Sequence, residues 1–420
     1  MKDRVTIDLA RCAGSPTYRG SGFIYGIARD AGEPPDRVLT DVATRFLRAG
    51  GSQTNCPKGG YVNGDYEPRW QSARAYFEKA KSIGATFELM PSDLWGADAV
   101  CEVPRWPGDG GDWTEYSTFM DRVIADARAA GMTGSNVRWD LWNEADLDIF
   151  WGPGFERFVE LWDRGFKQLR AALPDASIVG PSLSWYPSEG NDHWTTWLDA
   201  ARAGGTIPDY ISWHGEQGDD DPVSEAQTLD SMLAARGIVV TGYDMNEYGT
   251  RDEQNPGRSA WFIARLERAR GGIDGARGNW AMGDGLYGGM GGMVNGDWQP
   301  TGQWWIYRRY AQQTGSRTTV EPGDQLDAVA FQDERKRRSI AVVGNRGGCS
   351  GEAGILVRNA PSWLTTGGLL HVLVERMPSG TDVLAAPLVV ADFRVTADAS
   401  LVIPIDWTDP SDGYVITLGD

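Results

Sequence analysis

The sequence predicts an α/β chain in which a closed (β/α)8 barrel is followed by an antiparallel β-sandwich. The first observation is a series of eight short apolar runs, each followed by a stretch whose apolar residues recur every three to four positions. The second is a change to an alternating pattern after Gly315, and the third is the length of 420 residues. A barrel of about 250 to 300 residues and a module of about 100 residues account for that length.

Amphipathic helices with clear ends separate the predicted barrel strands. The first helix follows Pro34 and Pro35, because proline suits the first turn of a helix. Gly84 and Gly131 end later helices, since glycine adopts the left-handed conformation easily. The strands are expected at residues 20–27, 46–51, 85–90, 137–142, 177–180, 210–214, 238–242 and 276–282. The later helices are expected at residues 68–83, 113–130, 155–173, 194–202, 223–236, 258–270 and 303–313. Consecutive strand–helix units favour a closed parallel barrel over an open sheet.

The C-terminal part has the alternating pattern of an antiparallel sandwich. Its strands are expected around residues 328–331, 340–343, 371–374 and 414–417, separated by Gly, Pro and Asp turns. Residues 5–9 also alternate but have no local partner, so we expect them to join this module. The predicted domains are residues 1–15, the N-terminal strand of the sandwich, 16–316, the barrel, and 317–420, the sandwich. No low-complexity linker separates them, which predicts rigid packing.

The composition narrows the class of partner. The formal net charge of −18 argues against a nucleic acid or an anionic membrane surface, because both select basic patches. There is no run of about 18 apolar residues, so no membrane span is expected. The 19 Trp and 14 Tyr residues suit a carbohydrate partner, since flat aromatic rings stack on the apolar faces of sugars. The oligomeric state stays open.

The N-terminus and the cysteines bear on the compartment. The first residues lack the apolar core of a secretory signal, so we expect a secreted protein whose leader has been removed, with a cytoplasmic location as the alternative. The four cysteines have no C-x-x-C spacing, which disfavours zinc and thioredoxin-like roles. In an oxidising compartment the expected disulfides are Cys56–Cys101 and Cys12–Cys349.

Several chemistries are excluded by missing motifs. The three histidines, His193, His214 and His371, have no metal-ligand spacing, so no metal is expected. No dinucleotide or P-loop glycine pattern opens a helix after a strand, so no nucleotide cofactor is expected. The G-x-S-x-G elbow of serine hydrolases is absent from the sequence.

Two glutamates after barrel strands carry the predicted chemistry. Residues 138–146 begin as a buried strand and end in Asn143 and Glu144, where loop-built sites form. Three strands later, Glu247 takes an equivalent place. Two carboxyl groups about 5 to 5.5 Å apart can break a glycosidic bond with retention of configuration. Glu216 after strand six is the main competitor of Glu247, and Glu88 is a further rival.

This arrangement resembles the clan A of retaining (β/α)8 glycoside hydrolases. The resemblance implies that Glu144 is the acid/base and Glu247 the nucleophile. Within the clan, residues 142–151 are most similar to glycoside hydrolase family 39, in which Trp-Asn-Glu-Pro-Asn is common, although Ala145 replaces the proline. Residues 48–51, Arg-Ala-Gly-Gly, are similar to an element of families 39 and 79, and the sandwich with its N-terminal strand is also similar to family 39. Such enzymes act on β-D-xylosides, α-L-uronides and arabinose-containing side chains.

Three polar residues are expected to support the two glutamates. Asn143 should hydrogen-bond the sugar hydroxyl next to the anomeric carbon. His214 should lie near the nucleophile, with a purely structural role as the alternative. Arg48 should lower the pKa of Glu247 and keep it ionised while Glu144 stays protonated, with a salt bridge at the bottom of the barrel as the alternative.

The remaining substrate-binding candidates are mostly aromatic. Trp280 ends the predicted strand eight, where a flat platform under the reacting sugar would be useful. Trp95 and Tyr61 are weaker candidates, with core packing as the alternative, and Glu216 also faces the mouth. Long loops after strands two, three and eight favour a pocket and hence release of a terminal sugar. The competing function is a non-catalytic sugar-binding protein, and the sugar itself stays open.

Overall fold

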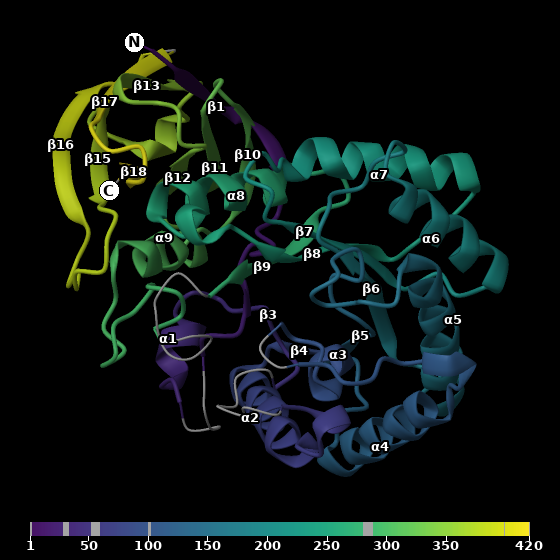
Figure 1. Ribbon diagram of the computed structural model, residues 1–420. Coiled ribbons are helices and arrows are strands. Elements are labelled where there is room, and N and C mark those ends of the chain that lie inside the picture. The colour runs from purple at the N-terminus through teal and green to yellow at the C-terminus, as the bar shows by residue number, and fades with distance from the viewer. Residues whose placement is uncertain are drawn as a thin grey trace.

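The computed structural model describes residues 2–27, 33–51, 59–99, 102–279, 289–398 and 400–419. Eight parallel strands close into a barrel surrounded by helices, and a ten-stranded sheet lies beside it (Figure 1). The predicted fold class is therefore confirmed. The described helices include none that is both long and apolar enough to cross a membrane.

The barrel closes because its first strand pairs with both its second and its last strand. The strands are β2 (Gly22–Ile24), β3 (Phe46–Ala49), β4 (Thr86–Leu89), β5 (Val137–Asp140), β6 (Ser177–Leu183), β7 (Tyr210–Gly215), β8 (Gly242–Tyr248) and β9 (Ile273–Gly278). Apolar side chains fill the space between strands and helices, as Phe87 and Ile211 do, both fully buried. The carboxyl ends of all eight strands face the same side, where the predicted site residues lie.

Strand seven lies in a different place from the one that the sequence predicts. Residues 238–241 of the predicted strand form a connecting segment, and Val239 is 90% exposed. The strand itself runs from Gly242 to Tyr248 and points Asp244 and Asn246 into the barrel, which hides its apolar pattern. Glu247 is consequently part of the strand, not of the turn after it. The eighth strand is also earlier than predicted, at Ile273–Gly278, and Trp280 lies outside the described residues.

The eight predicted helices form in the predicted order, and a short helix at residues 91–95 is additional to them. They are α1 (Asp36–Thr40), α2 (Tyr66–Ile83), α3 (Pro91–Trp95), α4 (Thr114–Ala130), α5 (Phe155–Ala172), α6 (Asp192–Gly204), α7 (Pro222–Arg236), α8 (Pro256–Arg268) and α9 (Gly302–Ala311). Short 3-10 turns are η1 (Tyr61–Asn63), η2 (Asp109–Gly111), η3 (Arg251–Glu253) and η4 (Ser362–Leu364). Gly84 ends α2 with a φ of 72° and Gly131 ends α4 with a φ of 79°, as expected for helix-ending glycines.

The second sheet combines both ends of the chain. Its strands are β1 (Arg4–Gly14), β10 (Ser316–Glu321), β11 (Leu326–Asp333), β12 (Arg338–Asn345), β13 (Gly351–Arg358), β14 (Thr365–Thr366), β15 (Leu369–Met377), β16 (Leu388–Thr396), β17 (Ser400–Trp407) and β18 (Gly413–Gly419). Strand β1 pairs antiparallel with β10 and parallel with β13, which confirms that the N-terminal strand joins this module. Residues from both halves of the sheet, including Ile7, Ile355 and Ile416, share one apolar core.

The sheet packs on the barrel through α8, which contacts β11 and β12 (Figure 1). Gly344 on β12 is needed at this contact, because a Cβ there would lie 2.0 Å from the backbone nitrogen of Trp261 on α8. The peptide N–H of Gly257 also donates to the carbonyl of Ser411 at 2.8 Å. Backbone-level contact of this kind fixes the two parts against each other.

The predicted bond between Cys12 and Cys349 is wrong, because both are free thiols. Strand pairing explains why. Arg4 lies opposite Gly354, so Cys349, which precedes β13, is near the start of β1. Cys12 is near the other end of β1, opposite Thr318, where it is exposed. Cys56 and Cys101 lie outside the described residues.

Candidate active site

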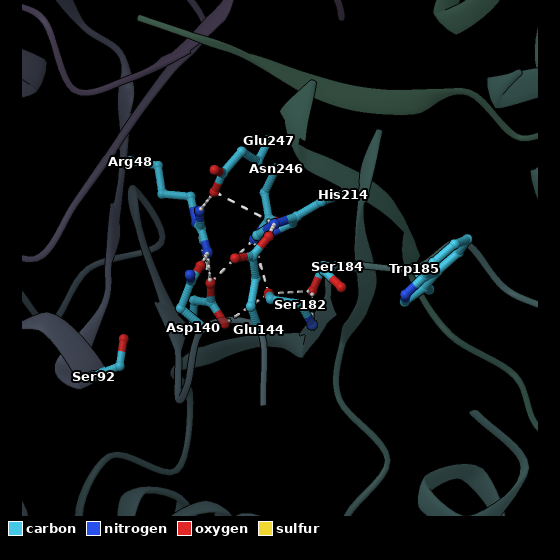
Figure 2. Close-up of polar contacts among 12 residues, drawn as sticks. Arg48, Ser92, Asp140, Glu144, Ser182, Ser184, Trp185, His214, Asn246 and Glu247 are labelled. Carbon is cyan, nitrogen blue, oxygen red and sulfur yellow. Dashed lines mark hydrogen bonds and ion pairs between the residues drawn. The ribbon is translucent and has the colours of Figure 1, made fainter. Parts of the chain in front are cut away.

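Four barrel strands bring the polar residues of the predicted site together at their carboxyl ends (Figure 2). Arg48 comes from β3, His214 from β7 and Glu247 from β8. Asn143 and Glu144 lie in the loop that begins after β5, behind Leu141 and Trp142. The five side chains are buried, which predicts strong electrostatic coupling among them.

The two glutamates lie on either side of one imidazole nitrogen. His214 Nδ1 is 2.8 Å from Glu144 Oε1 and 3.5 Å from Glu247 Oε2. One carboxylate oxygen of Glu144 and one of Glu247 lie within 4.8 Å of each other. This closeness suits direct attack by a carboxylate better than the wider gap of about 6.5 to 9.5 Å that admits a water molecule.

Burial controls the protonation of these groups. It raises the pKa of Glu144 to about 8, and the nearby Asp146 carboxylate adds to the rise. Burial lowers the pKa of His214 to about 4, so the ring is neutral near pH 7. Burial also raises the pKa of Glu247, but the Arg48 guanidinium opposes this rise. The direction of the Arg48 effect is the one expected from the sequence, and Glu144 is a carboxylic acid at neutral pH.

Arg48 connects both glutamate-bearing strands. Its Nη1 donates to Glu247 Oε2 at 2.8 Å, and its Nη2 donates to Asn143 Oδ1 at 2.7 Å and to Asp140 Oδ2 at 2.6 Å. Because Asn143 accepts through Oδ1, its Nδ2 is left to donate to another group. The alternative role expected for Arg48, a salt bridge at the bottom of the barrel, is filled by Arg138, which pairs with Asp244 and Asp274.

Further buried polar residues hold Arg48 in place. The sequence analysis did not predict their role. Asp140 Oδ1 accepts from Ser182 Oγ at 2.8 Å, and Asn246 Nδ2 donates to Asp140 Oδ2 at 3.1 Å. The same Nδ2 donates to Glu88 Oε1 at 2.8 Å. Polar residues at alternate positions of β5 and β8 are the sequence signal for these residues. Glu88 is fully buried behind Arg48 and so lies below the mouth.

The backbone at Glu144 has an unusual conformation. Its φ is 44°, a left-handed value that non-glycine residues seldom adopt. The Glu144 N–H donates to the carbonyl of Ser182 at 2.9 Å, and Ser182 also has a positive φ of 52°. Strained backbone of this kind is frequent at functional sites. It turns the chain so that the Glu144 side chain reaches His214.

Glu216 follows β7 and is electrostatically coupled to both glutamates. Burial raises its pKa well above the usual value, and the charges of Glu247 and Glu144 raise it further. Its Oε1 is buried without a hydrogen-bond partner among the described residues. Burial and the two neighbouring glutamates therefore disfavour the ionised form of Glu216.

The predicted aromatic residues lie apart from the carboxyl groups. Trp95 is fully buried in α3 and packs edge-on against Phe119 at 5.2 Å between ring centroids. Tyr61 stacks on Trp95 with centroids 5.5 Å apart. Both rings thus have protein neighbours, which agrees with the packing alternative.

A metal ion is the other occupant to consider. Glu144, His214 and Glu247 each offer one ligand atom, all within 4.8 Å. However, Arg48 already donates to Glu247 Oε2, the oxygen nearest His214. The fixed guanidinium charge supplies the positive charge that the carboxylates need, so these residues fit a metal-independent site better.

The chain was compared with protein families and with individual known proteins. No family model matches the chain. A relative, the 3-O-alpha-D-galactosyl-alpha-L-arabinofuranosidase of Bifidobacterium longum subsp. longum, is 21% identical over 410 residues, covering 81% of this chain and 33% of that protein. The chain thus spans about one third of the length of this relative.

Solved structures share the whole architecture. N2152 from Neocallimastix frontalis superposes with a TM-score of 0.81 and 23% identity over 100% of both chains. A family 39 β-xylosidase from Caulobacter crescentus has a TM-score of 0.63 and 13% identity, covering 99% of this chain and 100% of its own. The chain therefore has the (β/α)8 fold of clan A glycoside hydrolases, the clan that its sequence resembles.

Proposed function

We propose that the protein is a retaining glycoside hydrolase that releases a terminal sugar through a covalent glycosyl-enzyme. The observation that carries this proposal is the pair of buried carboxyl groups, Glu144 and Glu247, with oxygens within 4.8 Å at the barrel mouth. The raised pKa of Glu144 makes it the proton donor. Arg48 favours the ionised form of Glu247, which makes it the nucleophile.

In the first step, a Glu247 oxygen forms a bond to the anomeric carbon while the bond to the leaving oxygen breaks. The Glu144 proton moves to that oxygen, so the leaving group departs as a neutral alcohol. In the second step, Glu144, now a carboxylate, takes a proton from water. The water oxygen attacks the anomeric carbon, Glu247 leaves, and Glu144 is protonated again.

The neighbouring residues act on the same sugar. Asn143 presents its Nδ2 to the hydroxyl beside the anomeric carbon, because Arg48 occupies its Oδ1. Neutral His214 holds the Glu144 side chain at 2.8 Å. Glu216, whose pKa is raised by burial, hydrogen-bonds a sugar oxygen. These contacts strengthen as positive charge develops on the ring.

The substrate class follows from anomeric geometry. The named relative is an arabinofuranosidase and a structural neighbour is a β-xylosidase. α-L-Arabinofuranosides and β-D-xylosides present the same anomeric arrangement to a retaining pair. We therefore place pentosides first, and the competing function is a sugar-binding protein without turnover.

A panel of aryl α-L-arabinofuranosides, β-D-xylosides and β-D-glucosides tests the proposal. The wild type should release the phenol from at least one of them. Glu144→Ala should lose at least about 100-fold in turnover of substrates that need the proton, and azide should restore part of it. Glu247→Ala should be inactive, whereas Glu160→Ala, on the exposed face of α5, should match the wild type.

Proton NMR of the first product decides the stereochemistry. A product of retained configuration is expected, and inversion would remove Glu247 from the nucleophile role. Binding of the glycosides without any turnover would favour the sugar-binding alternative. Release of single sugars from an oligosaccharide supports terminal action, and longer first products contradict it.

A further inference from the structure

We propose that Trp185 is a specificity-determining platform for the sugar on the leaving-group side of the site. This proposal rests on the proposed hydrolase function and deepens it. No sequence pattern pointed to this residue. Its exposure, its hydrogen-bonded backbone and its link through Asp146 to the loop that carries Glu144 support the inference.

Trp185 is unusual in its exposure. The ring is 43% exposed, and within the described ranges it is the aromatic member of the exposed large hydrophobic residues. Most tryptophans of the barrel, such as Trp139 and Trp162, are almost completely buried. A large exposed aromatic ring beside a polar site is a typical means of binding a flat apolar face.

Hydrogen bonds fix the backbone of Ser184 and Trp185. The Asp146 carboxylate accepts from the backbone N–H of Ser184 at 2.9 Å, from its hydroxyl at 2.9 Å, and from the N–H of Trp185 at 3.2 Å. The carbonyl of Trp185 accepts from Trp194 Nε1 at 2.8 Å, and that of Ser184 accepts from Gln217 Nε2 at 2.9 Å. The ring is thus presented to solvent from a fixed position, which lowers the entropy cost of binding.

The same contacts tie Trp185 to the loop that carries the proton donor. Asp146 is two residues after Glu144, and Ser184 directly follows β6, whose Ser182 accepts the Glu144 N–H. Figure 2 shows Trp185 beyond Ser184, on the side of the cluster away from Arg48. Arg48, Asn143 and Glu247 define where the reacting sugar lies. The leaving group extends from that sugar past Glu144, toward Trp185.

This geometry identifies the ligand by its chemistry. A pyranose or furanose ring in the leaving group has an apolar C–H face that can lie on the indole. Tyr186 packs edge-on against Trp185 with centroids 6.0 Å apart and supports the ring. The platform therefore favours sugar leaving groups over small alcohols.

Two substrates that share the reacting sugar separate this role from others. One is the methyl glycoside, whose leaving group is too small to reach Trp185. The other is an oligosaccharide ending in the same sugar, either arabinose or xylose as the aryl panel selects. Trp185→Ala should lower kcat/KM for the oligosaccharide about tenfold and change that for the methyl glycoside less than about twofold. Trp185→Tyr should keep most of the activity.

Trp363→Ala, which removes a half-buried tryptophan from the sandwich, is the matched control and should leave both substrates unchanged. Equal losses for both substrates with Trp185→Ala, or no loss for either, would overturn the platform alone. Failure of the wild type on every substrate would instead overturn the proposed function, and the platform with it. Unchanged unfolding temperatures of the variants would show that the losses are not due to misfolding.

Discussion

Two buried arginines in the barrel have similar partners but different surroundings. Arg138 on β5 donates to Asp244 at 2.8 Å and to Asp274 at 2.7 Å. Arg48 on β3 donates to Asp140 at 2.6 Å and to Glu247 at 2.8 Å. Arg138 thus joins two carboxylates from other strands, and Arg48 joins three, since its Nε also lies 3.3 Å from Glu88 Oε1. Arg138 lies two residues before Asp140 on the same strand, one layer closer to the amino-terminal end of the barrel.

The two arginines differ in their contacts besides the carboxylates, and this difference separates a structural role from a role in the site. Arg138 is closed off by Tyr210, whose ring centroid is 4.1 Å from its guanidinium carbon. Arg48 also donates to Asn143, and both Asn143 and Glu247 keep a small exposed fraction, 6% and 9%. The same type of ion pair therefore stabilises the fold at one end and prepares the site at the other. Position relative to the strand ends decides which.

Arg48→Lys should have the largest effect. A lysine keeps the charge but has no planar fork to hold Asp140, Asn143 and Glu247 together. We expect kcat/KM to fall about 100-fold, measured on the best aryl glycoside, because Glu247 loses its fixed donor. An unchanged kcat/KM would mean that Arg48 resembles Arg138 after all.

Arg138→Lys is the matched variant in the lower layer, the layer of Arg138, Asp244 and Asp274 nearer the amino-terminal end of the barrel. It loses one charge-assisted hydrogen bond in a buried place, so the free energy of unfolding should fall by about 2 kcal/mol in urea titrations. The kcat/KM of the folded enzyme should stay within about twofold. A loss of activity similar to that of Arg48→Lys would erase the distinction between the layers.

The pH dependence of kcat/KM should come from the upper layer, the polar residues around Arg48 and Glu144 at the barrel mouth. Glu144 with a pKa of about 8 is protonated below that pH, so kcat/KM should fall about tenfold per pH unit above it. Because the folded-state pKa lies above the unfolded value, the proton also stabilises the fold, and this stabilisation is lost as pH rises through about 8.

Two variants check the origin of this alkaline limb. Glu144→Gln, assayed with a dinitrophenyl glycoside that needs no proton, should lack the limb, and its unfolding free energy should decline less between pH 5 and pH 9. Arg138→Lys should keep the limb. A limb that persists in Glu144→Gln would assign the titration to another group.

Tyr210→Leu should have the smallest effect. It removes the ring beside Arg138 while leaving both ion pairs, so we expect a loss of about 1 kcal/mol in unfolding free energy. Activity should be unchanged. Changed kinetic constants would show that the lower layer reaches the site.

The sequence predicted the barrel and the glutamate pair because their signals are local. Asn143 and Glu144 end an apolar run, and Glu247 follows Asn246 in the same way. Strand β8 was misplaced because the aliphatic run at 238–240 is more apolar than the strand, which turns Asp244 and Asn246 inward.

Other features depend on contacts between distant residues. Asp140 meets Arg48 across 92 positions of sequence, and Ser182 enters the same network only through the neighbouring strand. The exposure of Trp185 is set by bonds from Asp146 and Trp194, which no local pattern reports. The free thiol of Cys12 likewise follows from the register of β1, not from the even number of cysteines.

The position of β1 affects how the chain folds during synthesis and whether it can be divided into fragments. Thr6 lies opposite Glu321 on one side and Leu356 on the other, so an early segment of the polypeptide occupies an inner position among late ones. During translation β1 must wait for the whole barrel to be synthesised before its neighbours exist. Severing the chain between barrel and sandwich would strip both fragments of a strand partner and expose backbone edges that invite aggregation. Circular permutation that joins β1 directly to the late strands would allow the two parts to be separated while β1 keeps its strand partners.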